Sequence, residues 1–177
     1  PIPDLDERLV RAKTLDVFGT KMRSVIKEAN GPGIAKVVTQ QFDYGRNILA
    51  HGLVPIIEPE VDINAADKRD CEDLLRDSLR EQLAKLDGEL PVIFKLTLPE
   101  TDNFYQEFTN HPKVLRVVAL SGGYSREESN EKLYNNQQVI ASFSRALTEG
   151  LHAEQSADDF SAMLGSTVES IAAASAT

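Results

Sequence analysis

Cysteine, tryptophan and long apolar runs are scarce or missing in this sequence of 177 residues. It has no Trp, and Cys71 is its only cysteine, which excludes a disulfide within the chain and fits a reducing cytoplasm. No apolar run approaches the ~18 residues of a membrane-spanning helix, and no signal peptide is recognisable. Low-complexity linkers are missing too. The sequence therefore predicts one folding unit over residues 1–177, located in the cytoplasm and not in a membrane.

Positive charge is also in short supply. Against 28 Asp and Glu there are 19 Lys and Arg, so the net charge is −9. This excess of negative charge argues against nucleic acid or an anionic membrane surface as a partner. An anionic small molecule stays possible, because local basic residues determine the field inside a pocket. His51, His111 and His152 lack the spacing of metal ligands, so no metal site is expected.

Short apolar runs rich in β-branched residues alternate with longer polar stretches of helical spacing. The runs are residues 21–26, 53–57, 92–98, 114–120 and 139–143, and helical spacing covers residues 4–15, 33–51, 65–86, 127–138 and 158–174. The alternation predicts an α/β fold of βα units, with a parallel sheet covered by helices. A doubly wound sheet and a (β/α) barrel both fit. No glycine-rich nucleotide motif follows any of the runs, which favours the barrel.

Lys95 is a lone cation inside the apolar run PVIFKLTL. Strand side chains alternate between faces, so other charged residues can be assigned to a face in the same way. Glu58 and Glu60 share one face at the end of LVPIIEPE, and Lys21 and Arg23 share one face of KMRSVI. In a parallel barrel the carboxyl ends of all strands meet at one mouth, where active sites are built. We therefore expect these charged side chains to converge.

A buried lysine amine in such a site points to covalent chemistry. Burial and neighbouring cations favour the neutral amine, which attacks a carbonyl to form an imine. A carboxylate such as Glu58 can move the protons of that reaction. The alternative interpretation is structural: Lys95 extends its ammonium to solvent from the strand end, and the glutamates lie in solvated loops.

A second signal concerns phosphate. Ser121, Gly122 and Gly123 connect a strand end to a helix start in LSGGYSRE, and paired glycines let backbone N–H groups approach an anion. Arg145 follows the last apolar run, where its guanidinium could pair with the same phosphate. Phosphate sites after the last two strands recur in (β/α) barrels.

Together these segments resemble class I fructose-bisphosphate aldolases of the compact bacterial kind. The matching stretches, in the family's order, are FGTKMRS (18–24), LVPIIEPE (53–60), FKLTLP (94–99), LSGGYS (120–125) and SFSRAL (142–147). The resemblance implies a (β/α)8 TIM barrel, which typically needs about 250 residues. The chain would supply about five βα units, the fourth to eighth, as the C-terminal part of the barrel. The missing N-terminal part is therefore an expected partner.

The resemblance also implies roles for individual residues. Lys95 would form the Schiff base, Glu58 would be the principal acid and base, and Glu60 would support the lysine electrostatically. Lys21 and Arg23 would contact the substrate and stabilise developing charge. The residues implied to hold a phosphate are Ser121, Gly122, Gly123, Ser142 and Arg145.

The implied reaction is the reversible cleavage of fructose 1,6-bisphosphate into dihydroxyacetone phosphate and glyceraldehyde 3-phosphate, in glycolysis and gluconeogenesis. It needs no metal or other cofactor. Two other interpretations stay open, namely another Schiff-base aldolase barrel and a barrel fragment that acts as a binding module without catalysis. The first would share the lysine but lack the EPE and SGG segments. A homo-oligomer is possible in each case.

Overall fold

Five parallel strands form the centre of the molecule. The structure is a computed structural model and describes residues 2–88 and 90–177. The strands are β1 (Gly19–Ile26), β2 (Val54–Val61), β3 (Val92–Thr97), β4 (Val114–Leu120) and β5 (Val139–Ala141). They pair in chain order, each parallel to the next. Each strand overlaps one predicted apolar run, and β2 continues four residues beyond its run, to Val61. This confirms the α/β class and the five βα units.

Helices connect and flank the strands. They are α1 (Leu5–Thr14), α2 (Gly31–Ala50), α3 (Lys68–Ala84), α4 (Gln106–Thr109), α5 (Arg126–Tyr134), α6 (Arg145–Thr148) and α7 (Ala157–Ala174). The five longer helices lie at the stretches of helical spacing. The sequence did not predict α4 and α6, because four residues are too few to display an apolar stripe.

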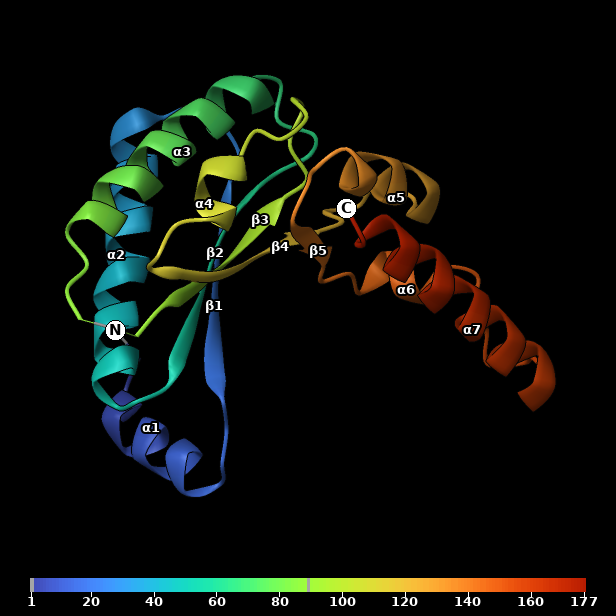
Figure 1. Ribbon diagram of the computed structural model, residues 1–177, viewed down its shortest axis with the longest axis horizontal. Coiled ribbons are helices and arrows are strands. Elements are labelled where there is room, and N and C mark those ends of the chain that lie inside the picture. The colour runs from blue at the N-terminus through green and yellow to red at the C-terminus, as the bar shows by residue number, and fades with distance from the viewer. Residues whose placement is uncertain (1, 89) are drawn as a thin grey trace.

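The long helices α2 and α3 cover one face of the sheet (Figure 1). Helix α2 begins at Asn30, whose side chain accepts a hydrogen bond from the Gly33 N–H at 2.9 Å. Its apolar stripe packs on the sheet, where Phe42 meets Phe94 edge to face with ring centroids 6.2 Å apart. On its other side Phe94 meets Phe108 of the α4 region at 5.3 Å. The main core therefore lies between the sheet and α2, α3 and α4.

The opposite face of the sheet, here called the inner face, is partly open. It carries the alternate strand residues, and Val25 and Ile140 on it are 41% and 36% exposed. Helices α5, α6 and α7 pack at the β5 end, and α7 extends away from the sheet (Figure 1). Over residues 2–88 and 90–177, no helix is both long and apolar enough to cross a bilayer.

Candidate active site

Three charged side chains meet on the inner face around Glu58. Lys95 Nζ lies 3.3 Å from Glu58 Oε1, and Lys21 Nζ lies 3.2 Å from Glu58 Oε2. The Glu58 carboxylate is almost fully buried, whereas the Lys21 side chain is 46% exposed and that of Lys95 is 19% exposed. Lys95 is thus reachable from solvent, and a buried carboxylate lies beside its amine.

Strand register explains how Lys21 and Arg23 reach their partners. Arg23 lies opposite Glu58 in the β1–β2 ladder, and Val25 lies opposite Glu60. Each cation therefore extends forward to the carboxylate at the next inner-face position of β2. Arg23 Nε donates to Glu60 Oε2 at 2.6 Å, and this hydrogen bond, followed by the charge of Glu60, raises the pKa of the guanidinium.

The two glutamates serve different neighbours in the part of the chain that the structure describes. Glu58 pairs with both lysines, and Glu60 pairs with Arg23. Glu58 Oε2 is buried and, among the described residues, accepts no hydrogen bond, although the Lys21 ammonium is at ion-pair distance. An ion pair without a hydrogen bond is possible here, because the Lys21 and Glu58 charges attract each other although the angle at the ammonium or the carboxylate is unsuitable for a hydrogen bond. This oxygen can therefore accept a hydrogen bond from a further donor.

A buried helix side chain holds the backbone of Glu58. Gln41, on the sheet-facing side of α2, accepts the Glu58 N–H at 2.8 Å through Oε1. Its Nε2 donates to Ser24 Oγ of β1 at 2.6 Å. Sequence reasoning did not select Gln41. The available signal was a glutamine on an apolar stripe, next to Phe42 and three residues after Val38.

The glycine loop follows β4 at the same edge of the sheet. Ser121 is buried, and its carbonyl accepts the N–H groups of Gly123 at 2.7 Å and Tyr124 at 2.9 Å. Gly122 has a φ of 65°, and an added Cβ there would lie 2.6 Å from Ile63 Cγ2. Only glycine combines this backbone conformation with such close approach.

Arg145 and Ser142 lie near this loop. An ideal Cβ on Gly123 would be 3.5 Å from Arg145 Nη1, so the guanidinium lies against the loop. Arg145 is the first residue of α6 and is exposed. The Ser142 N–H donates to the Ala119 carbonyl of β4 at 2.8 Å. The structure therefore brings Gly123 and Arg145 together, with Ser142 attached to the neighbouring strand.

The single cysteine does not form a second reactive centre. Cys71 is buried on α3, and burial, with the nearby Asp67 carboxylate, raises the pKa of its thiol to about 11. A thiol of this kind is a poor nucleophile at neutral pH. Within residues 2–88 and 90–177, no group of three or more His, Cys, Asp or Glu side chains is arranged to hold a metal ion.

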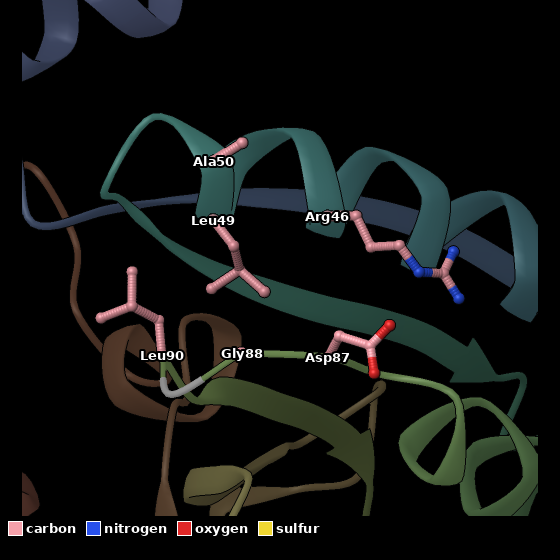
Figure 2. A pocket seen from close by; sticks show the side chains of 6 residues that line it. All are labelled: Arg46, Leu49, Ala50, Asp87, Gly88 and Leu90. Carbon is pink, nitrogen blue, oxygen red and sulfur yellow. The ribbon is translucent and has the colours of Figure 1, made fainter.

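A cavity of about 370 Å³ lies at the opposite end of the strands. Figure 2 shows Leu49 and Leu90 on opposite sides of it, with Arg46 and Asp87 toward one end. Leu49 lies near the end of α2, the helix before β2, and Leu90 lies just before β3, whereas Glu58 and Lys95 lie further along these strands. In parallel sheets, functional groups gather at the carboxyl ends of the strands, so the residues around Lys95 are the better candidate.

Comparisons with known proteins concern the whole chain. No protein-family model matches the chain. It is 54% identical over 175 residues to "Fructose-bisphosphate aldolase class 1" of Porphyromonas gingivalis. The matched region covers 99% of this chain and 59% of that relative. It is also 54% identical over 177 residues to the protein of that name from Synechocystis, covering 100% of this chain and 59% of the relative. The chain thus spans about three fifths of the length of these relatives.

A solved structure supports the fold. A co-crystal structure of fructose-bisphosphate aldolase from Plasmodium falciparum with TRAP and a small-molecule inhibitor has a TM-score of 0.66. The match covers 97% of this chain and 61% of that one, at 20% sequence identity. At this identity the likeness concerns the fold alone, and it agrees with a partial barrel of five βα units.

Proposed function

Because this chain is homologous along its whole length to class I fructose-bisphosphate aldolases, we propose that it carries the imine-forming lysine of such an enzyme. The reaction is the reversible cleavage of fructose 1,6-bisphosphate into dihydroxyacetone phosphate and glyceraldehyde 3-phosphate. The contact that carries the proposal is the 3.3 Å between Lys95 Nζ and Glu58 Oε1. It puts a buried proton acceptor beside a solvent-reachable amine at the catalytic edge of the sheet.

Lys95 begins the proposed reaction as the nucleophile. Its neutral amine adds to the ketone carbon, and loss of water from the carbinolamine leaves an imine. Removal of the proton from the C4 hydroxyl breaks the C3–C4 bond and releases glyceraldehyde 3-phosphate, with the electron pair retained as an enamine. Protonation of the enamine and hydrolysis then release dihydroxyacetone phosphate and restore the Lys95 amine. Glu58 exchanges the protons, and its buried oxygens are within reach of the amine.

The surrounding cations complete the proposed site. Lys21 holds Glu58 from the side opposite Lys95, and Arg23 with Glu60 forms a second pair one step along the strands. Glu60 supports the lysine through the field of this pair. Ser121, Gly122, Gly123, Ser142 and Arg145 hold a substrate phosphate.

Trapping with borohydride tests the role of Lys95. Dihydroxyacetone phosphate is incubated with the intact protein, borohydride reduces the imine to a secondary amine, and peptide mass spectrometry locates the label. We expect the label on Lys95 and none on Lys95 peptides without borohydride. Lys95→Met should abolish labelling and cleavage. Lys85→Met removes a half-exposed surface lysine that pairs with Glu81, and should keep both.

Two results would contradict this proposal. One is a Lys95→Met protein that still cleaves fructose 1,6-bisphosphate. The other is a reduced adduct found on another lysine while Lys95 stays unmodified. Since the proposed chemistry uses the amine without a metal ion, cleavage should also persist in excess EDTA.

We also propose that the functional unit contains further barrel strands. The support is the inner face, where Val25 and Ile140 at the two sides of the sheet are exposed although both are apolar. An open parallel sheet with bare edge strands is a poor solution for a free-standing protein. Pairing at β1 and β5 would bury these residues around the site, in a cytoplasmic glycolytic enzyme. Hydrogen exchange on the intact protein should show protected amides in both edge strands. Rapid exchange there would contradict closure.

A further inference from the structure

A buried ion cluster lies on the helix side of the sheet, just beyond the strand that carries Lys95. Lys68 and Glu72 of α3 are 6% and 1% exposed and form an ion pair. The Lys68 ammonium also donates to the Leu98 carbonyl at 3.0 Å and pairs with Glu100 Oε1 at 3.0 Å. The Glu100 N–H donates to Glu72 Oε2 at 3.2 Å. The segment that follows β3 is thereby fastened to α3.

The same cluster reaches the glycine loop. Tyr124 directly follows Gly122 and Gly123 in the chain. Its hydroxyl donates to Glu100 Oε1 at 3.0 Å. Lys132 of α5 lies 3.8 Å from the same oxygen and 5.0 Å from the centre of the Tyr124 ring. Glu100 belongs to the segment that follows the Lys95 strand, and its carboxylate accepts a hydrogen bond from the residue after the two glycines, so it joins this segment to the glycine loop.

Charge and burial keep the contact in one protonation state. Burial alone would raise the pKa of Glu100, but the hydrogen bond and charge of Lys68 outweigh it and lower the pKa below its usual value. Burial and the hydrogen bond to Glu100 raise the pKa of Tyr124. At neutral pH the phenol therefore stays a donor and the carboxylate an acceptor.

The glycines need such an external support. Gly122 and Gly123 both have positive φ and carry no side chain, so little within the loop itself restrains its backbone. Tyr124 is the first side chain after them. We propose that Glu100 is a positioning residue: through Tyr124 it holds the glycine loop in register with the Lys95 strand, so that the loop receives the substrate phosphate. The inference rests on the function proposed above and adds a phosphate-specific role for a residue outside the set proposed to hold the phosphate.

Two ketones that differ only in phosphate test this role. Dihydroxyacetone phosphate and dihydroxyacetone are each trapped by borohydride on the intact protein, and labelling of Lys95 is followed against ketone concentration. In Glu100→Gln and Tyr124→Phe, the half-saturating concentration of the phosphorylated ketone should rise about tenfold, as for the loss of one charge-assisted hydrogen bond. Labelling by dihydroxyacetone should change less than about twofold, within what surface substitutions cause.

The double variant and a control sharpen the result. If both residues act through one hydrogen bond, the double variant Glu100→Gln with Tyr124→Phe should need no more phosphorylated ketone for half-saturation than either single variant. Glu107→Gln makes the same carboxylate-to-amide change in a surface pair with Arg80, and should leave both ketones unaffected. Inorganic phosphate should compete about tenfold less well in the two single variants.

Three outcomes overturn the inference. If labelling by both ketones weakened equally, the substitutions would be damaging the Lys95 region in general. An unchanged response to dihydroxyacetone phosphate would mean that Glu100 does not position the loop. A wild-type protein in which neither ketone labels Lys95 would refute the proposed function itself, and this inference with it. That last failure is separate from the other two, because it appears before any variant is made.

Discussion

Gln41→Met should weaken both the fold and the proposed reaction. Gln41 is 4% exposed and accepts the Glu58 N–H at 2.8 Å. Methionine has a similar size and shape but no acceptor of comparable strength, so this buried N–H loses its partner. Leaving a buried donor unsatisfied costs about 1–3 kcal/mol. Ser24 is only half-buried and can turn to water. We therefore expect a loss of about 2 kcal/mol in the free energy of unfolding, measured by urea denaturation of the intact protein.

The kinetic effect follows from the position of Glu58. With its N–H released, the β2 backbone can shift, and the carboxylate moves relative to Lys95. Misplacement by about 1 Å can cost on the order of 100-fold in rate. We expect kcat for fructose 1,6-bisphosphate to fall about 10- to 100-fold, with a smaller change in KM.

Gln82→Met is the matched control. Gln82 is also a buried helix glutamine, 6% exposed, which donates to Thr39 Oγ1 at 3.1 Å and accepts from Arg46 Nη2 at 3.3 Å. Its partners are half-buried side chains that can turn to water, so its loss should cost less stability, and it should leave kcat unchanged. The reasoning is refuted if Gln41→Met keeps the wild-type kcat, or if both variants lose activity to the same degree.

Three further predictions concern the core, the glycine loop and the ion cluster. Phe94→Ala should lower the free energy of unfolding by about 3–5 kcal/mol in urea, because the ring is fully buried between two aromatic neighbours; a loss below about 1 kcal/mol would contradict this packing. Gly122→Ala should raise KM for the bisphosphate about tenfold or more in steady-state assays, because its φ is 65° and Ile63 is too close; an unchanged KM would argue against a phosphate at the loop. The pKa of Glu100 lies below its usual 4.5, so its stabilising contribution is complete above that pH and is lost as the pH falls through the lowered value. Urea titrations from about pH 6 to pH 3 should show a smaller loss in Glu100→Gln, and identical losses would refute the assignment.

The sequence was sufficient to predict the strands and the longer helices. β-Branched apolar runs mark β2, β3 and β4, because strands buried between helices and a barrel interior need apolar side chains along most of their length. Helix α6 is an element that apolar periodicity did not predict. Arg145 was expected after the last strand, and it lies there, but as the first residue of a four-residue helix. Such a turn forms from local chain geometry, which apolar periodicity does not report.

Strand alternation also predicted which charged residues share the inner face. It could not predict which of them pair. Lys21 and Arg23 each reach forward along the ladder, so Glu60 contacts Arg23 rather than the lysine it was expected to support. Pairing depends on register and side-chain reach, and both follow from tertiary structure. That Glu60 acts on Lys95 through its electrostatic field stays a prediction, since the two side chains form no ion pair in the described residues.

The polar residues that sequence reasoning overlooked have one physical property in common. Gln41, Lys68 and Glu72 each lie on the apolar stripe of a helix, the side that packs on the sheet. Burying such groups is costly unless each finds a partner, so they are expected only where a strand offers an unsatisfied backbone group or charge. Gln41 accepts the Glu58 N–H, Lys68 donates to the Leu98 carbonyl and pairs with the Glu100 carboxylate, and Glu72 accepts the Glu100 N–H. These partners belong to β2 or to the segment after β3, near the proposed catalytic pair. In these three cases a polar residue that interrupts an apolar helix stripe supports a strand or the segment after it, beside Lys95 and the glycine loop, whereas Gln82 of α3 pairs with Thr39 and Arg46 of α2.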